Sequence, residues 1–194
     1  MNAIGGLDIG TTGSKISLYD EKARLLVSYY TEYVASVNDG AHTVHFGVIF
    51  DAVKKLLREA TEKYDITALG VTSFGETFAM LDEDDNILAP SFLYTDPRGS
   101  DECNSLCDML GRDHLTLLGG VKPHSMYSIY KMMWHKNNNS DLFSKCKKIL
   151  LVEDFIIYSL TGKRQISYSL AARTGAFDIE KKELDKRSLR YLRH

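Results

Sequence analysis

Three strand-like segments joined by short turns open the chain. Residues 4–8 are a short apolar run, residues 14–19 alternate apolar and polar side chains, and residues 25–34 are rich in Val and Tyr. Because links this short join neighbouring antiparallel strands, the pattern predicts a three-stranded antiparallel meander. Over residues 46–64 apolar side chains fall three and four positions apart, which predicts an amphipathic helix packed against that sheet.

After this helix, strand and helix patterns alternate along the chain. Strands are expected at 68–73, 78–81 and 148–152, and helices at 100–110, 127–136, 154–160 and 185–192. Hairpin strands followed by such an alternation predict an α/β fold with a mixed sheet and helices on both of its faces. The polar connector at 35–44 is expected to be an exposed loop, and His42 within it and His45 directly after it are expected to be exposed loop histidines. With 3 prolines and no Ser/Gly-rich linker, residues 1–194 are expected to form one domain.

Composition and charge exclude several classes of protein. Lys and Arg number 24 against 26 Asp and Glu, and the net charge of −2 lacks the basic excess of a nucleic-acid binder. An apolar content of 44% excludes intrinsic disorder, and no apolar run approaches the roughly 20 residues that a membrane helix needs. The odd number of cysteines, 3, favours a reducing compartment. We therefore expect a cytoplasmic protein with no nucleic acid and no membrane among its partners.

A turn rich in glycine and threonine follows the first strand, in the segment LDIGTTGSK at residues 7–15. Gly10 and Gly13 can adopt positive φ angles, and the N–H groups and hydroxyls of the turn can hydrogen-bond phosphate oxygens. Asp8, at the end of the strand, can orient Mg²⁺ or its water ligands. The segment is not a Walker loop, because a strand pattern rather than a helix follows the glycines. An ordinary glycine hairpin is the alternative interpretation.

A second group of polar residues follows two later strands. Glu76 comes soon after the strand at 68–73, and Tyr94, Asp96 and Arg98 follow the next β element. Carboxylates, a guanidinium and an aromatic ring suit a polyhydroxylated ligand, whose hydroxyls need acceptors and donors and whose C–H face stacks on a ring. Surface charge in two loops is the alternative interpretation.

Six blocks occur in a characteristic order along essentially the whole chain. They are LDIGTTGSK, GVTSFGETFAMLD, LYTDPRGSDEC, KMMWHKNNNSDLF, LLVEDFIIYSLTGK and SYSLAARTGAFDI. This order resembles the N-terminal domain of the FGGY carbohydrate kinases, the group that contains xylulose, gluconate and glycerol kinases. The resemblance implies the actin-like, ribonuclease-H-like ATPase fold. It also implies transfer of the ATP γ-phosphoryl, with Mg²⁺, to a hydroxyl of a ketose, sugar acid or polyol, with a xylulose-like sugar favoured.

The resemblance assigns the cofactor contacts to the first block. Asp8, Gly10, Thr11 and Thr12 match the family's first phosphate motif, and Lys15 stands where a basic residue often follows. By the same resemblance, Asp8 would serve the Mg²⁺ ion.

The sugar contacts are assigned to the second and third blocks. Glu76 matches a substrate-binding glutamate of glycerol kinase, but the arginine that precedes it there is Gly75 here, which disfavours glycerol. Xylulose kinases usually carry Met-His near these two positions. Tyr94, Asp96 and Arg98 resemble a Trp-x-Asp-x-Arg pattern in which tyrosine replaces tryptophan. The sixth block is expected to be mainly structural.

The resemblance also implies that residues 1–194 lack the family's catalytic residue and its second domain. The family's catalytic aspartate lies in a Gly-Asp block beyond His194, and an adenosine-binding second domain follows it, so no catalytic residue is assigned within residues 1–194. We expect the chain alone to be inactive and to work with a separate C-terminal kinase half, beside its small-molecule partners, the sugar and ATP. A non-catalytic carbohydrate-binding or regulatory remnant is the alternative, and a homodimer is left open.

Overall fold

The computed structural model describes residues 1–38 and 40–192; Asp39, within the connector expected to be a loop, lies outside the described residues, as do Arg193 and His194. The strands are β1 (Asn2–Ile9), β2 (Gly13–Tyr19), β3 (Leu25–Glu32), β4 (Ser36–Asn38), β5 (Ala41–Val44), β6 (Asp65–Ser73), β7 (Phe78–Leu81), β8 (Ser91–Phe92), β9 (Lys148–Leu151), β10 (Phe177–Asp178) and β11 (Glu183–Leu184). The helices are α1 (Phe46–Thr61), α2 (Ser100–Leu110), α3 (Arg112–Gly119), α4 (Ser128–Asn138), α5 (Ser140–Lys145), α6 (Val152–Thr161), α7 (Tyr168–Ala172), α8 (Lys186–Leu189) and the 3-10 turn η1 (Arg190–Leu192).

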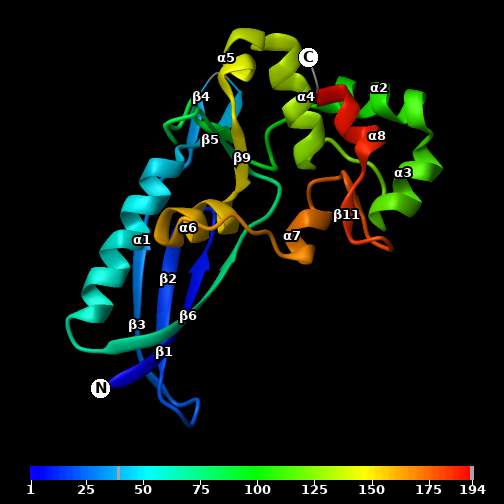
Figure 1. The fold of residues 1–194 in the computed structure, drawn as a ribbon. Coiled ribbons are helices and arrows are strands. Elements are labelled where there is room, and N and C mark those ends of the chain that lie inside the picture. Colours follow the sequence, from blue (N-terminus) through cyan, green and yellow to red (C-terminus); the bar gives the residue numbers. More distant parts are fainter. Residues whose placement is uncertain (39, 193–194) are drawn as a thin grey trace.

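The main sheet has the strand order β3-β2-β1-β6. β1 pairs with β2, and β2 with β3, in the antiparallel sense, whereas β1 and β6 run parallel. The expected meander at the start of a mixed sheet is therefore confirmed. In Figure 1 this sheet and α1 form the lower left part of the molecule.

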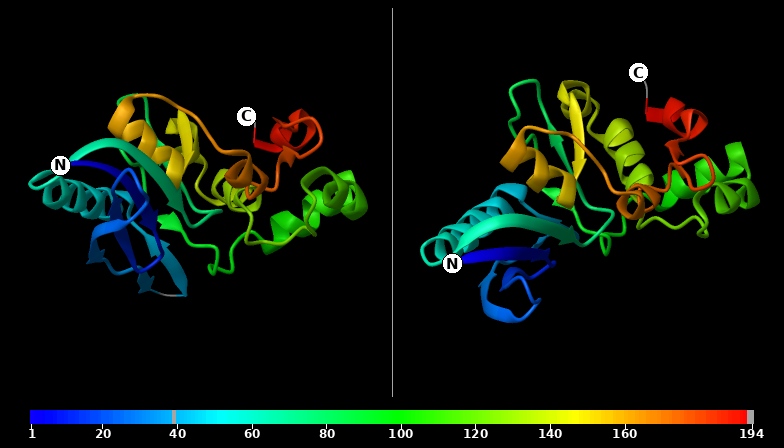
Figure 2. Two further views of the ribbon diagram at one scale, coloured as in Figure 1. Left: turned by 90° about the horizontal axis from the view of Figure 1, so that it is seen from below. Right: turned by 60° about the horizontal axis from the view of Figure 1, so that its bottom comes forward.

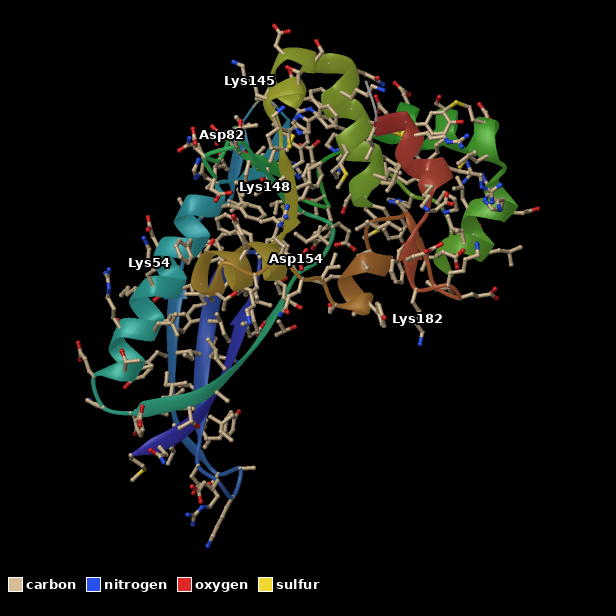
Figure 3. The ribbon with its side chains drawn as sticks, viewed as in Figure 1. Lys54, Asp82, Lys145, Lys148, Asp154 and Lys182 are labelled. Carbon is tan, nitrogen blue, oxygen red and sulfur yellow. The ribbon has the colours of Figure 1, made fainter. Side chains whose placement is uncertain are left out.

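α1 covers one face of the main sheet. Its first turn is capped by His45, whose Nδ1 accepts a hydrogen bond from the Gly47 N–H at 3.1 Å. Lys54 lies on the outer side of the helix, away from the sheet (Figure 3). The buried side chains recur three and four positions apart, as the sequence predicted; they are Phe46, Ile49, Ala52, Val53, Leu56 and Ala60.

α6 lies on the same face of the sheet as α1. Residues of both helices belong to one hydrophobic cluster with alternate residues of β1 and β2, such as Leu7 and Ile16. This arrangement differs from the expectation of helices on both faces. Within the described residues the second face carries an open groove of about 420 Å³, lined in part by Asp8, Lys15 and Thr72. These three polar side chains interrupt the apolar surface against which a helix would pack.

The connector at 35–44 is not the loop that its polarity suggested. β4 and β5 form an antiparallel pair, and β5 also pairs with β8. His42 is half-buried in β5, with Nδ1 3.1 Å from Thr95 Oγ1, whereas His45 is exposed at the start of α1. The partner strand β8 is distant in sequence, so the polar residues of β5 gave no local sign of it.

A second group of elements stands beside the sheet. α2, α3, α4 and α8 surround a separate hydrophobic cluster that includes Leu106, Leu115 and Tyr130 (Figures 1 and 2). α3, α5 and α7 were not expected; each has fewer than ten residues, too few to show a clear helical period. Among the described helices, none is long and apolar enough to cross a membrane.

Candidate functional site

The parallel pairing of β1 and β6 brings the two polar segments to one edge of the sheet. Ile9 pairs with Ser73 at the ends of the two strands, and the Phe74 N–H donates to the Ile9 carbonyl at 3.0 Å. The carboxyl ends of parallel strands meet at the same edge, which is where α/β folds bind ligands. The glycine–threonine turn after β1 and the segment that leads to Glu76 after β6 are therefore neighbours.

The turn after β1 is held by hydrogen bonds from nearby residues. The Gly10 N–H donates to the Gly13 carbonyl at 2.9 Å, and the Tyr33 N–H donates to the Thr12 carbonyl at 3.1 Å. The Tyr33 hydroxyl donates to the Gly10 carbonyl and lies 3.3 Å from Ser14 Oγ. Burial raises the pKa of Tyr33, which keeps its hydroxyl protonated as a donor. The backbone shape of the turn is thus set by the first three strands and Tyr33, the residue that follows them.

Gly10 and Gly13, which can adopt positive φ angles, do not have them in this turn. Steric contact explains the glycine at position 13 instead. A Cβ atom there would lie 2.3 Å from the Tyr30 hydroxyl and 2.8 Å from the Thr31 carbonyl oxygen. A side chain at this position would push β2 away from β3.

Candidate phosphate contacts lie on the accessible side of the turn. Thr12, Asp8 and Lys15 are exposed and Thr11 is half-buried, and Asp8 stands opposite Lys15 in the register of β1 and β2. The described residues contain no group of three or more His, Cys, Asp or Glu side chains that could hold a metal ion. A single exposed carboxylate fits Mg²⁺, which proteins often hold through one or two carboxylates, water and substrate phosphates.

Glu76 is buried and paired with a residue that the sequence had assigned a structural role. Its Oε1 accepts hydrogen bonds from the Arg173 guanidinium, which lies 5.1 Å from the centre of the Tyr127 ring. Glu76 has a φ of 65°, uncommon for a residue with a side chain and a form of strain that clusters at ligand sites. Gly75 packs closely against Arg173. A Cβ atom at position 75 would lie 3.3 Å from Arg173 Cγ.

Asp96 organises its own loop. Its side chain has 0% exposure; Oδ1 accepts from the Arg98 N–H at 3.0 Å and Oδ2 from the His42 N–H at 2.8 Å. The Arg98 guanidinium lies 3.4 Å from Asp96 Oδ2 and sits over the rings of Phe92 and Trp134, 4.4 and 5.0 Å from their centres. These contacts hold the planar guanidinium of Arg98 in one orientation.

Of the three predicted site residues in this loop, Tyr94 and Arg98 reach the surface and Asp96 does not. Tyr94 is 40% exposed and the Arg98 side chain 27% exposed. Arg173 joins them as a residue that sequence reasoning missed. Its place in the SYSLAARTGAFDI block was the available signal, but its separation of 97 positions from Glu76 hid the ion pair.

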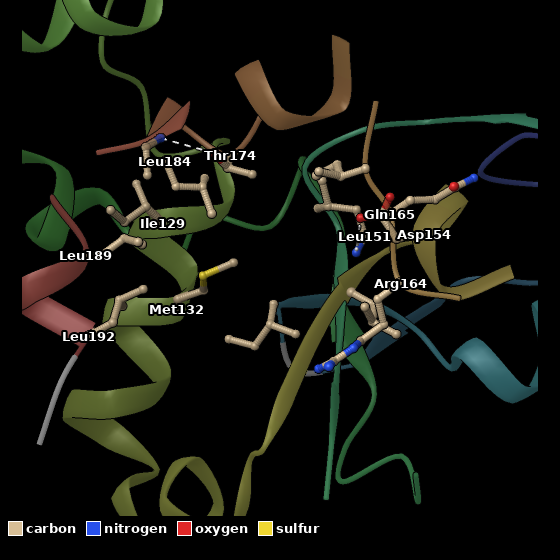
Figure 4. Close-up of a pocket in the computed structure, with 14 residues that line it drawn as sticks. Ile129, Met132, Leu151, Asp154, Arg164, Gln165, Thr174, Leu184, Leu189 and Leu192 are labelled. Atoms are coloured by element: carbon tan, nitrogen blue, oxygen red, sulfur yellow. Dashed lines mark hydrogen bonds between the residues drawn. The ribbon is translucent and has the colours of Figure 1, made fainter. Parts of the chain in front are cut away.

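The apolar cavity in Figure 4 contains none of the expected site residues. Its volume is about 450 Å³; Ile129, Met132 and Leu192 line one side, and Leu151 and Asp154 line the other. Burial raises the pKa of Asp154 from its ordinary 3.8 to about 7, because the carboxylate loses water there.

Comparison with known proteins identifies the family. Residues 3–193 match the model of the FGGY family of carbohydrate kinases, N-terminal domain. The chain belongs to this family. It is 26% identical over 189 residues to a xylulose kinase of Lactococcus lactis, covering 94% of this chain and 38% of that protein. It is 25% identical over 191 residues to a gluconokinase of Bacillus subtilis, covering 95% of this chain and 37% of that protein.

Solved structures confirm the fold class. A ligand-bound xylulose kinase from Lactobacillus acidophilus matches 99% of this chain and 40% of its own length, with a TM-score of 0.91 and 28% identity. A gluconate kinase from the same organism matches 98% of this chain and 39% of its own length, with the same TM-score and identity. The α/β fold of this chain is therefore the actin-like ATPase fold of the sugar kinases. The chain spans about two fifths of the length of the curated relatives it matches.

Proposed function

We propose that this chain is the sugar-binding N-terminal part of an ATP-dependent carbohydrate kinase in the cytoplasm. The reaction transfers the ATP γ-phosphoryl to a hydroxyl of a ketose, sugar acid or polyol. The observation that carries the proposal is the parallel pairing of β1 and β6, which puts the glycine–threonine turn beside the Glu76 segment. Phosphoryl transfer depends on positioning a phosphoryl donor next to an acceptor hydroxyl, and this edge of the sheet can hold both.

On the phosphate side, the turn supplies hydrogen-bond donors and Asp8 supplies a carboxylate. The hydroxyls of Thr11 and Thr12, the Gly10 backbone region and the Lys15 ammonium are within the segment that would face the phosphate groups. Mg²⁺, when bound, neutralises charge that develops on the phosphoryl oxygens. Asp8 would orient that ion or its water ligands.

On the sugar side, Tyr94 and Arg98 offer an aromatic face and guanidinium donors. Glu76 and Gly75 form the opposite segment, with Arg173 adding a second guanidinium, and Asp96 shapes the loop. Names of relatives favour a xylulose-like sugar or gluconate as the substrate class. One wall of a cleft buries little of a sugar, so we expect a millimolar dissociation constant, about −4 kcal/mol.

Titration of the ¹⁵N-labelled chain with ketoses, sugar acids and polyols tests the sugar site by NMR. Shifts should concentrate at Gly75, Glu76, Tyr94 and Arg98, and Glu76→Gln should weaken them. Glu62→Gln, which changes an exposed glutamate at the end of α1, is the matched control. Shifts confined to residues remote from this cluster would remove the assignment.

A coupled assay tests the need for a second half. Within residues 1–194 we assign no general base and no adenosine site, and losing a base alone costs roughly 10² to 10⁴ in rate. The lone chain should release no ADP above background, whereas adding the C-terminal half of a related kinase should restore sugar-dependent turnover. Sugar-dependent turnover by the lone chain, abolished in Glu76→Gln or Asp96→Asn, would instead make that carboxylate the base.

A further inference from the structure

One turn of α4 contacts both segments of the candidate sugar site. Ser128, the first residue of α4, donates through Oγ to the Glu76 carbonyl at 2.6 Å. Lys131, three residues later on the same side of the helix, donates through Nζ to the carbonyls of Asp96 at 2.7 Å and Arg98 at 3.0 Å. The two segments are thus joined through one rigid element.

Both side chains are fully buried, at 0% exposure, and neither reaches the surface of the site. A buried lysine is rare because removing an ammonium group from water is costly. Here burial lowers the pKa of Lys131 to about 8, with the Asp96 charge opposing this shift and the Arg98 charge adding to it. Its hydrogen-bond partners are backbone carbonyls, so the contact fixes the path of the loop rather than neutralising a carboxylate.

The loop that Lys131 holds lies directly on the helix. Gly99 has a φ of 94°, and a Cβ atom there would be 3.1 Å from the carbonyl carbon and Cβ of Tyr130. One turn beyond Lys131, Trp134 lies under the Arg98 guanidinium. α4 therefore sets both the backbone of the loop and the plane of its exposed arginine.

We propose that Ser128 and Lys131 are positioning residues that set the distance between the Glu76 segment and the 94–98 loop, and with it the affinity for sugar. This inference rests on the proposed function, in which these two segments bind the sugar. Neither residue touches the ligand. Each acts through a backbone carbonyl of a residue that lines the site.

The test compares Lys131→Met, Lys131→Gln and Ser128→Ala with two control variants of the full chain. Lys145→Met removes an exposed lysine, and Met133→Ala makes a cavity in the core between α2 and α4 without touching either segment. Amide hydrogen exchange, followed by NMR, measures local opening, and titration with xylulose and gluconate measures affinity. If Lys131→Met does not fold, Lys131→Gln carries the same comparison.

The substitutions at Lys131 and Ser128 should change amide exchange in different segments of the chain. Lys131→Met should speed exchange at residues 94–99, and Ser128→Ala should speed it at 75–77. Ser128→Ala should weaken sugar binding about tenfold, the effect of one lost hydrogen bond from a buried group, and Lys131→Met, which loses two, should weaken it by at least as much. Met133→Ala should lower thermal stability without this pattern. Unchanged exchange in both segments, or unchanged affinity in the variants, would overturn the inference. A wild-type chain that binds no sugar would defeat the proposed function, and the exchange pattern alone would then decide whether α4 positions the loops.

Discussion

Replacing Asp154 with asparagine should stabilise the protein above neutral pH and change it little near pH 5. Asp154 is 4% exposed at the start of α6, beside the apolar cavity of Figure 4. Its Oδ2 accepts from the Leu151 N–H at 3.2 Å, whereas its Oδ1 is buried without a partner among the described residues. Burial is the main cause of its raised pKa; the Glu153 charge adds to the rise and the Leu151 hydrogen bond opposes it.

The magnitude follows from the two pKa values of this carboxyl. Between about pH 4 and pH 7 the folded protein holds a proton that the unfolded chain has lost, so the free energy of unfolding falls as the pH rises. A pKa of about 7 against 3.8 places the cost of the ionised carboxylate at about 4 kcal/mol above pH 7. Asparagine removes the charge and keeps an oxygen for the Leu151 N–H, but its buried NH₂ group lacks a partner, which offsets about 1–2 kcal/mol. The net gain at pH 8 should be about 2–3 kcal/mol.

Urea unfolding followed by circular dichroism at pH 5 and pH 8 measures this difference. Asp108→Asn, at an exposed position of α2, provides the matched control and should be nearly neutral at both pH values. Equal stability of Asp154→Asn and wild type at pH 8 would refute the reasoning. So would the same gain at both pH values, because the effect would then not come from ionisation.

Three further substitutions test the contacts around the sheet edge. Gly13→Ala should destabilise the fold by about 1–3 kcal/mol in urea unfolding, because its Cβ would meet Tyr30 and Thr31, and Tyr30→Ala should recover part of the loss. Arg173→Met should cost about 1–3 kcal/mol by leaving the buried Glu76 carboxylate unpaired, and adding Glu76→Gln should restore part of it, as a double-mutant cycle measures. Asp8→Ala should leave the melting temperature unchanged but abolish any Mg²⁺-dependent change that ATP causes in the NMR spectrum of the protein. A large fall in melting temperature would instead show that the Asp8 side chain stabilises the fold.

Local patterns in the sequence were enough to predict the elements whose contacts lie close together along the chain. The meander and α1 follow from alternation and helical spacing, and the expected start of α1 at residue 46 matches its cap at His45. β4 and β5 were not predictable in the same way. Both strands are short and mix polar with apolar residues, and the second partner of β5, β8, lies some fifty residues further along the chain.

The residues of the candidate site show the same difference between local and distant contacts. Asp8 is exposed because it lies at an outward position of the alternating strand β1, and Thr11 and Thr12 reach solvent in the turn that follows. Lysine is a surface residue by type, so nothing in the sequence indicated that Lys131 would be buried beneath Asp96 and Arg98. The pairing of Glu76 with Arg173 was hidden for a related reason, since a block-by-block interpretation assigns each block a role without showing which blocks meet.

The two sides of the candidate site should therefore differ in how firmly they are held. The glycine–threonine turn is fixed by Tyr33, 23 residues from Gly10 and within the same meander. The sugar side depends on bonds that span 35, 52 and 97 residues, from Lys131, Ser128 and Arg173. Contacts between distant segments are lost together when the elements that carry them separate, whereas a turn held by residues of the adjoining meander persists. Loosening of α4 would then weaken the sugar binding proposed for this site while leaving the glycine–threonine turn intact.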